Sequence, residues 1–279
     1  MKGCIAFDID GTLTHRLDWI DPKVVSALEN LAAEGWTIAL LTGRIFSFAW
    51  EILQHFHFPY LVAVQNGADI LTMPGKDHLR QNYLRSDILP EIEEAYAGFS
   101  EDFIIYAGID KGDFCYFRER RFSEKALQYL KKLESLGAAP WQPSDFSFGK
   151  EEKFPLIKCF GEEKAMREVY AKLQHNPKIE VSLIRDPVDP ALYLNLITHP
   201  QAHKGAVVHF LREHFHPPVM IAAGDDHNDI KMLEEADIAI VVETAPKEVL
   251  ACADVLARPA KELGILKAIE EAIALRGSL

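Results

Sequence analysis

The feature that most constrains this chain is a pair of aspartates that directly follows a short apolar segment near its start. Residues Gly3 to Phe7 carry no charge, and Asp8-Ile9-Asp10-Gly11-Thr12 comes next. An uninterrupted apolar run of this length is typical of a β-strand that is buried on both faces, as in the parallel sheets of α/β proteins. Ligands bind at the carboxyl ends of the strands of such sheets, so we expect both carboxylates to lie at a ligand-binding edge.

The remainder of the first 80 residues, and the last 90, alternate helical patterns with candidate strands. Asp21 before Pro22 has the form of a helix start, and Gly35 that of a helix stop. Repeated strand–helix–strand order requires a parallel sheet with right-handed crossovers, so we predict an α/β fold with a Rossmann-like core and helices on both faces. The candidate strands after the first are the apolar runs 36–41, 60–64, 219–223 and 238–242.

Residues 85–187 interrupt this alternation. They contain broken β-like runs and two helical patterns, which together indicate an α+β insertion. We therefore predict two domains, an α/β core formed by residues 1–84 and 188–279, and an inserted domain formed by residues 85–187. Pro187 marks the expected return to the core.

The charge of the chain excludes several classes of partner. Its 279 residues include 30 Lys plus Arg and 42 Asp plus Glu, which gives a formal net charge of −12. Such a chain repels phosphate backbones and anionic lipid, so we expect neither nucleic acid nor a membrane as partner. No apolar run approaches the ~18 residues of a membrane span, and Asp8 comes too early for a secretory signal, which predicts a cytoplasmic protein. The four separated cysteines indicate neither a disulfide framework nor a zinc site.

The carboxylates of Asp8 and Asp10 would lie close together, so they repel each other unless a cation lies between them. Gly11 allows the tight turn that would aim both at one point. The functional interpretation is a Mg²⁺ site in which one carboxylate attacks phosphorus and the other moves protons. The simpler interpretation is an ordinary Asp-Gly turn after a strand.

Three further segments supply complementary chemistry. Thr42-Gly43-Arg44 ends a predicted strand, where a hydroxyl and free N–H groups bind phosphoryl oxygens, or where Thr42 simply caps a helix. Lys204-Gly205 begins a predicted helix and offers a positive charge, although a surface lysine would look the same. Gly224-Asp225-Asp226-His227-Asn228-Asp229 follows a predicted strand, and oxygen ligation of Mg²⁺ explains its acids better than a polar loop does.

Taken in this order, the four segments resemble the motifs of haloacid dehalogenase-like phosphatases. The segment Gln65-Asn66-Gly67-Ala68 and the large insertion resemble the Cof-type branch, subfamily IIB. This resemblance implies that the insertion is a C2-type cap domain, which would act as a lid over the substrate.

The resemblance also implies a role for each matched residue. Asp8 would form an aspartyl-phosphate, while Asp10 would protonate the leaving oxygen and then activate water. Thr42 and Lys204 would hold the phosphoryl oxygens. The implied Mg²⁺ ligands are Asp8, Asp10 through its carbonyl, Asp225 and Asp229. The implied phosphate and substrate contacts are Gly11, Thr12, Gly43, Arg44, Asn66 and Asn228.

These roles lead to a Mg²⁺-dependent phosphatase that acts on a small phosphomonoester, such as a sugar phosphate, as a monomer or small homo-oligomer. A phosphohexomutase of the same superfamily is the alternative, and the basic cluster Arg118-Glu119-Arg120-Arg121 is its best support because a mutase holds a second phosphate. A non-catalytic binding protein on this scaffold is a third, less favoured hypothesis, because the acids and the lysine of all four segments are present.

Overall fold

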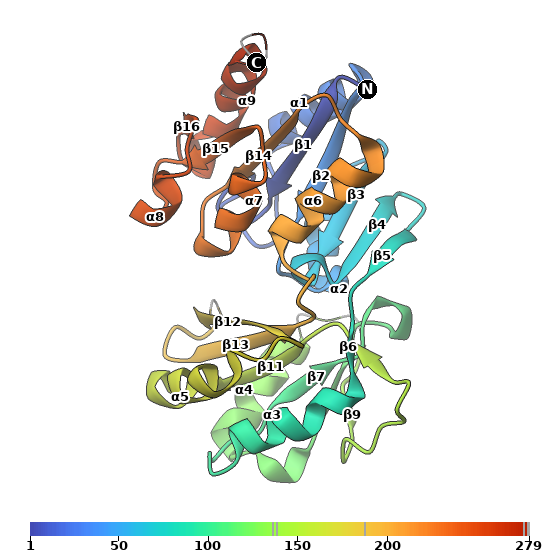
Figure 1. The fold of residues 1–279 in the computed structure, drawn as a ribbon, viewed down its shortest axis with the longest axis vertical. Helices are drawn as coiled ribbons and strands as arrows, with labels where there is room; N and C mark the ends of the chain where they lie inside the picture. The colour runs from blue at the N-terminus through green and yellow to red at the C-terminus, as the bar shows by residue number, and fades with distance from the viewer. Residues whose placement is uncertain (136, 138, 187, 276, 278–279) are drawn as a thin grey trace. The chain divides into compact units, whose positions relative to one another are not determined.

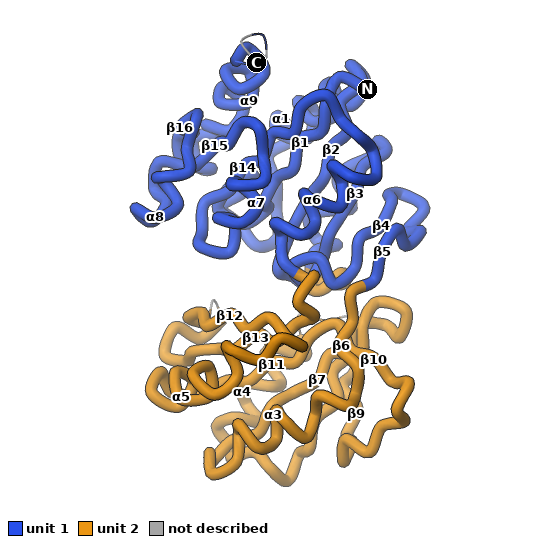
Figure 2. Tube along the Cα trace, in the orientation of Figure 1, with its two compact units in different colours: residues 1–44, 49–81, 203–279 blue, residues 45–48, 82–202 orange. Residues whose placement is uncertain are grey.

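The computed structural model describes residues 1–135, 137, 139–186, 188–275 and 277 of the chain. The chain divides into two compact units (Figure 2). Unit 1 comprises residues 1–44, 49–81 and 203–279, and unit 2 comprises residues 45–48 and 82–202.

Unit 1 is built on an eight-stranded sheet with the order β16-β15-β14-β1-β2-β3-β4-β5 (Figure 1). The six strands from β16 to β3 run parallel, and β4 and β5 are antiparallel to their neighbours. The strands are β1 (Gly3–Asp8), β2 (Trp36–Leu41), β3 (Tyr60–Val64), β4 (Asp69–Met73), β5 (Asp77–Gln81), β14 (Met220–Gly224), β15 (Ile238–Val242) and β16 (Val255–Ala257).

The central strands are covered on both faces. Ala6 and Phe7 are consecutive residues of β1, so their side chains point to opposite faces of the sheet, and both are fully buried. In Figure 1, α6 and α7 lie over one face and α1 lies behind the sheet. The predicted α/β fold with a largely parallel sheet is confirmed.

Side chains cap the start of two helices of unit 1, and the first of these starts is the one predicted at Asp21 and Pro22. Asp21 caps α1 by accepting a hydrogen bond from the N–H of Lys23 at 2.8 Å, and the ring of His203 caps α6 by accepting one from Ala206 at 3.1 Å. The helices are α1 (Pro22–Ala33), α2 (Phe46–Leu53), α6 (Lys204–Phe215), α7 (Ile230–Glu234), α8 (Lys247–Leu250) and α9 (Gly264–Leu275), with 3₁₀ turns η1 (Gln65–Gly67), η5 (His227–Asp229) and η6 (Ala260–Glu262). The first residues of α2, up to Phe48, belong to unit 2.

Unit 2 is an α+β unit with a six-stranded sheet of order β12-β13-β11-β7-β8-β9 and a separate pair formed by β10 and β6. Helices α3 and α5 pack on one apolar cluster of this unit, and α4 packs on another. The strands are β6 (Leu84–Arg85), β7 (Ile104–Tyr106), β8 (Cys115–Phe117), β9 (Gln142–Pro143), β10 (Lys153–Phe154), β11 (Ile157–Gly161), β12 (Glu180–Arg185) and β13 (Tyr193–Thr198). The helices are α3 (Leu89–Tyr96), α4 (Glu124–Glu134) and α5 (Glu163–Leu173), with 3₁₀ turns η2 (Ser86–Ile88), η3 (Ile109–Lys111) and η4 (Glu119–Arg121).

The ends of unit 2 differ from the predicted insertion, residues 85–187. The longer of the two pieces of unit 2 runs from Asn82 to Ala202, and the shorter piece is Ile45–Phe48. The later end has a physical reason, because β13 pairs antiparallel with both β11 and β12 and so belongs to the sheet of unit 2. Pro187, the expected point of return, lies outside the described residues.

None of the helices in the described part of the chain combines the length and the apolar composition that a membrane span requires.

Candidate active site

Segments that are far apart in the sequence meet at the carboxyl ends of β1 and β14. The two strands are parallel neighbours, with Phe7 opposite Ala223. Asp8 is the last residue of β1 and Gly224 is the last residue of β14, so the acids of both segments follow the same edge of the sheet. Lys204 is the first residue of α6 and reaches this edge as well. Such an edge is where parallel α/β sheets bind their ligands.

Lys204 links two of the acids. Its Nζ lies 2.5 Å from Oδ1 of Asp8 and 2.6 Å from Oδ1 of Asp229, and the three side chains are between 0% and 6% exposed. Burial alone would lower the pKa of a lysine, but the charges of Asp229 and Asp8 outweigh it and raise the pKa of Lys204 above its ordinary value. Lys204 is therefore positively charged at neutral pH.

The loop after β14 is organised around Asp229. Its Oδ2 accepts hydrogen bonds from the N–H groups of Asp225, at 3.0 Å, and Asp226, at 3.1 Å. A Cβ atom at Gly224 would lie 2.6 Å from the Cβ of Asp229, so only glycine leaves room for this side chain. With both oxygens engaged, Asp229 fixes Lys204 on one side and the backbone that carries Asp225 on the other.

The turn after β1 approaches Asp225 closely. Thr12 Oγ1 donates a hydrogen bond to Oδ1 of Asp225 at 3.1 Å. Gly11 has a φ of +87°, and a Cβ atom there would lie 2.1 Å from Oδ2 of Asp225. The positive φ and the close approach both require glycine at this position.

Three carboxylates form a group that suits a divalent cation. Asp8, Asp225 and Asp229 each offer an oxygen, and these oxygens lie within 4.8 Å of one another. Burial raises the pKa of Asp8 well above its ordinary value, because the attraction of Lys204 does not offset it and the nearby acids add to it. Burial and the charge of Asp229 raise the pKa of Asp225 to about 6. Oδ2 of Asp8 has no hydrogen-bond partner among the described residues. Buried, mutually repelling oxygen donors of this kind fit Mg²⁺, which is bound by carboxylates.

Arg44 binds Asp10 with two of its N–H groups. Nε of Arg44 lies 2.9 Å from Oδ2 of Asp10, and Nη2 donates to Oδ1. Nη1 donates to the carbonyl of Leu17 at 2.6 Å, and the Arg44 side chain is only 4% exposed. The sequence analysis expected Arg44 to contact phosphate, whereas in the structure its guanidinium is engaged by Asp10 and Leu17, because the fork of an arginine matches a carboxylate.

Thr42, Gly43 and Asn66 lie next to one another at the same edge. The N–H of Asn66 donates to the carbonyl of Thr42 at 2.9 Å, and the N–H of Gln65 donates to the carbonyl of Arg44 at 2.8 Å. A Cβ atom at Gly43 would lie 3.3 Å from Oδ1 of Asn66. Gln65 and Asn66 have φ values of 49° and 60°, a left-handed backbone that non-glycine residues seldom adopt and that occurs preferentially at functional sites.

Gln65, in the same turn as Asn66, is a candidate site residue for which no role was predicted. Gln65 is buried, and neither its Oε1 nor its Nε2 has a hydrogen-bond partner within the described part of the chain. Oδ1 of Asn66 is in the same situation. In the sequence, Gln65 is marked only by its place before Asn66. The feature that distinguishes it is its left-handed backbone, which only the structure reveals.

The predicted site residues thus form two groups. Asn228 belongs to neither, since it is exposed on η5 and none of the described hydrogen bonds involves its side chain. The first group surrounds the three carboxylates and consists of Asp8, Gly11, Thr12, Lys204, Asp225 and Asp229. The second consists of Asp10, Thr42, Gly43, Arg44 and Asn66.

Known proteins resemble this chain over nearly its whole length. A Haemophilus influenzae protein named "Putative phosphatase" is 34% identical over 277 residues, which cover 97% of this chain and 98% of that protein. Two solved structures have the same fold. One is a haloacid dehalogenase-like hydrolase from Bacteroides thetaiotaomicron, with a TM-score of 0.76, 22% identity, and coverage of 97% of this chain and 99% of that one. The other is the HAD subclass IIB sugar phosphatase BT4131, with a TM-score of 0.72, 23% identity, and coverage of 96% of this chain and 98% of that one. The family model for haloacid dehalogenase-like hydrolases matches residues 5–269. The chain is a member of the haloacid dehalogenase-like hydrolase family.

Proposed function

We propose that this hydrolase is a Mg²⁺-dependent phosphatase that cleaves small phosphomonoesters through an aspartyl-phosphate. The observation that carries the proposal is the group formed by Asp8, Lys204, Asp225 and Asp229, in which a buried carboxylate with one unpartnered oxygen lies against a lysine and two further acids. This arrangement supports the proposal because Asp8 would attack beside a positive charge, which phosphoryl transfer requires.

In the proposed first step, a carboxylate oxygen of Asp8 attacks phosphorus, and the bond between phosphorus and the leaving-group oxygen breaks. Asp10 donates a proton to that oxygen, so the alcohol leaves neutral. In the second step, Asp10 takes a proton from a water molecule whose oxygen attacks phosphorus. The bond between phosphorus and Asp8 then breaks, which restores the carboxylate and releases inorganic phosphate.

The chain's own residues hold the phosphoryl group in this scheme. Lys204 is buried and charged, so it neutralises an oxygen that gains charge in the transition state. Thr42 and Asn66 lie beside each other at this edge, and the Thr42 hydroxyl and the Asn66 side-chain amide would donate hydrogen bonds to the phosphoryl oxygens. Asp8 and Asp225 would hold Mg²⁺ with Asp229 beside them, and when bound the ion supplies further positive charge at the phosphoryl oxygens.

We further propose that residues 82–202 serve as the cap that selects the substrate, and that the substrate is a small phosphorylated metabolite such as a sugar phosphate. The support is the name of the Haemophilus relative and the fold shared with a subclass IIB sugar phosphatase. The phosphohexomutase alternative rested on the cluster Arg118–Arg121. In the structure Arg118 is bound by Asp102 and Glu93, so the second phosphate of a mutase substrate would depend on Arg120 and Arg121.

The test is release of phosphate from p-nitrophenyl phosphate and from a panel of sugar phosphates with Mg²⁺. Asp8→Asn and addition of EDTA are each expected to abolish turnover, while the control Asp18→Asn, an aspartate 68% exposed, keeps it. Full activity of Asp8→Asn, or in EDTA, would refute the proposal. Conversion of mannose 1-phosphate to the 6-phosphate without release of phosphate would establish the mutase instead.

A further inference from the structure

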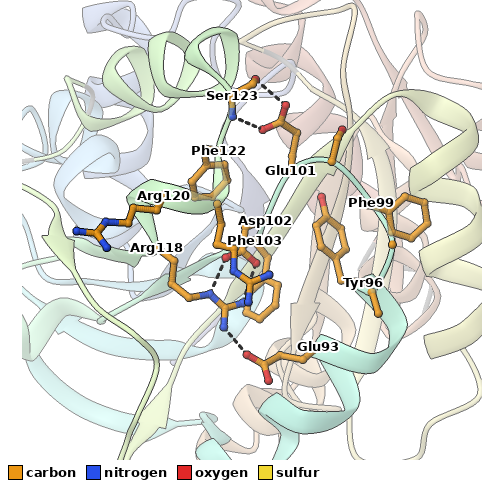
Figure 3. Close-up of a pocket in the computed structure, with 14 residues that line it drawn as sticks. Glu93, Tyr96, Phe99, Glu101, Asp102, Phe103, Arg118, Arg120, Phe122 and Ser123 are labelled. Atoms are coloured by element: carbon orange, nitrogen blue, oxygen red, sulfur yellow. Dashed lines mark hydrogen bonds and ion pairs between the residues drawn. The ribbon is translucent and has the colours of Figure 1, made fainter.

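Unit 2 contains a cavity that is separate from the residues of the candidate active site (Figure 3). Its volume is about 650 Å³, which falls in the range of small-molecule binding sites. Its walls come from the C-terminal half of α3 with the segment up to Phe103, and from the segment between Arg118 and Ser123. All of these residues belong to unit 2.

Arg118 lines the cavity and forms ion pairs with Asp102 and Glu93, which line it as well. Nε of Arg118 lies 2.6 Å from Oδ2 of Asp102, and its Nη2 lies 2.8 Å from Oδ1, while Nη1 donates to Glu93. The guanidinium also lies 5.2 Å and 4.3 Å from the ring centroids of Phe103 and Phe146. Figure 3 shows Arg118 held between the two acids. Its charge is therefore matched from within the protein.

The third acid of the cavity wall is also engaged. Glu101 accepts hydrogen bonds from the N–H of Ser123 at 3.0 Å and from its hydroxyl at 2.6 Å. Ser123 is the N-cap of α4, so Glu101 lies where the helix dipole favours a negative charge. All three acids of the cavity wall thus already bind groups of the protein.

Arg120 and Arg121 are the two other arginines that line the cavity. Both are exposed on η4, and within the described residues neither side chain has a hydrogen bond, an ion pair or a ring contact. The two arginines therefore bring two positive charges to the cavity wall, which a dianion in the cavity would neutralise. Arginine forks match the oxygens of a phosphate especially well.

We propose that this cavity is a second ligand-binding site, for a small phosphorylated metabolite whose phosphate binds Arg120 and Arg121. The cavity is much larger than a phosphate ion, and Phe99 and Phe122 provide apolar wall for the remainder of the ligand. A neighbouring cavity of about 280 Å³ shares the wall formed by Tyr96, Phe99 and Glu101, which extends the space available. The site would bind an effector or a carried metabolite without being part of the hydrolytic centre.

The experiment is calorimetric titration of the full chain carrying Asp8→Asn, in EDTA so that hydrolysis is excluded. The probes are inorganic phosphate and AMP. The test variant is Arg120→Gln/Arg121→Gln, and the matched control is Arg85→Gln/Arg167→Gln, which removes two exposed arginines of unit 2 that do not line the cavity. We expect the Kd of AMP to rise by at least about tenfold in the test variant only, the loss typical of charged hydrogen bonds.

The outcomes separate the possible ligands. Tighter binding of AMP than of phosphate supports a phosphate ester, whereas equal or weaker binding of AMP overturns that assignment in favour of the free ion. An unchanged Kd in Arg120→Gln/Arg121→Gln, or no binding of either probe at millimolar concentration, overturns the site. In the otherwise native chain with Mg²⁺, the same variant is expected to leave the KM for p-nitrophenyl phosphate unchanged. A parallel rise in that KM would assign both arginines to the substrate site and so also refute the proposal.

Discussion

Arg44 donates hydrogen bonds to both carboxylate oxygens of Asp10 and to the carbonyl oxygen of Leu17. Asp10 is 41% exposed at its side chain, whereas Arg44 is buried, so the arginine is the fixed partner and the aspartate is the one it orients. The two hydrogen bonds fix the orientation of the Asp10 carboxylate, which is the proposed acid.

The first prediction concerns this pair. Arg44→Lys keeps the charge but cannot form the two parallel hydrogen bonds. If Arg44 orients Asp10, kcat should fall by about 10²-fold on an alkyl phosphate, whose leaving group needs a proton, since general acid catalysis contributes ~10² to 10⁴-fold. The loss should be much smaller on p-nitrophenyl phosphate, which leaves readily without one. A purely structural role for Arg44 predicts equal losses on the two substrates, and steady-state kinetics on both decide between these outcomes.

The second prediction concerns the glycine that faces Asp225. Gly11→Ala adds a Cβ atom 2.1 Å from Oδ2 of Asp225 at a φ of +87°. We expect a displaced carboxylate, a raised Mg²⁺ requirement and a fall in kcat of about 10²-fold, the scale of a 1 Å misplacement. Gly35→Ala is the matched control, because its φ is +97° but nothing lies within 4 Å of the added atom. That control should lose about 1 kcal/mol of stability through its backbone and keep its activity. Similar Mg²⁺ dependence of the two variants would contradict the assignment of Asp225.

The third prediction concerns the buried lysine. Lys204→Met leaves Asp8 and Asp229 buried and facing each other without a cation. Removing one partner of a buried ion pair costs about 3–5 kcal/mol, so the free energy of unfolding, measured in urea with EDTA, should fall by that amount. Lys267→Met, at a lysine that is 83% exposed, should change stability by less than about 1 kcal/mol. A cost for Lys204→Met as small as that of the control would mean that the acids are not charged together in the native state.

The fourth prediction concerns two aspartates of unit 2 with opposite pH behaviour. Burial raises the pKa of Asp113 above its ordinary 3.8, although the N–H of Ser47 donates to it at 2.6 Å. Native protein thus retains this proton longer than unfolded protein, so the contribution of Asp113 is full below pH 3.8 and is lost as pH rises through the higher native pKa. Asp113→Asn should therefore gain stability relative to the parent chain as pH rises from 3.8 towards neutrality.

Asp145 provides the comparison for that experiment. The hydrogen bond from the N–H of Ser147, at 3.0 Å, lowers the pKa of Asp145. Its contribution is present above pH 3.8 and is lost as pH falls through the lower native pKa. Asp145→Asn should therefore lose stability relative to the parent chain as pH rises through the window below 3.8. Chemical unfolding of all three proteins between acid and neutral pH tests both slopes, and slopes of the same sign would contradict the assignment.

The core of the fold and the first group of site residues were predictable for a single reason. In a parallel sheet all strands end at one edge, so an acid after one apolar run and an acid after another must lie near each other. This is how Asp8 and Asp225, more than 200 positions apart, were expected together, and the structure places their oxygens in one group.

The parts that escaped prediction depend on long-range partners. The antiparallel hairpin of β4 and β5 was not anticipated, because its short strands carry no period that separates them from a loop. The residues of β13 fell in the predicted core segment 188–279, and their pairing with β11 and β12 is what assigns them to unit 2. The ion pair of Arg44 with Asp10 likewise depends on side-chain geometry that sequence spacing does not encode.

Unit 2 is assembled from two pieces of chain, and this limits how it can be exchanged between relatives. A graft of residues 82–202 alone would leave behind Ile45–Phe48, the segment that the structure groups with unit 2. Asp113 would then lose Ser47, whose N–H it accepts. At the other junction the graft would stop immediately before His203, the cap of the helix that begins with Lys204. A transplantable cassette for changing specificity therefore consists of both pieces, joined without disturbing that histidine.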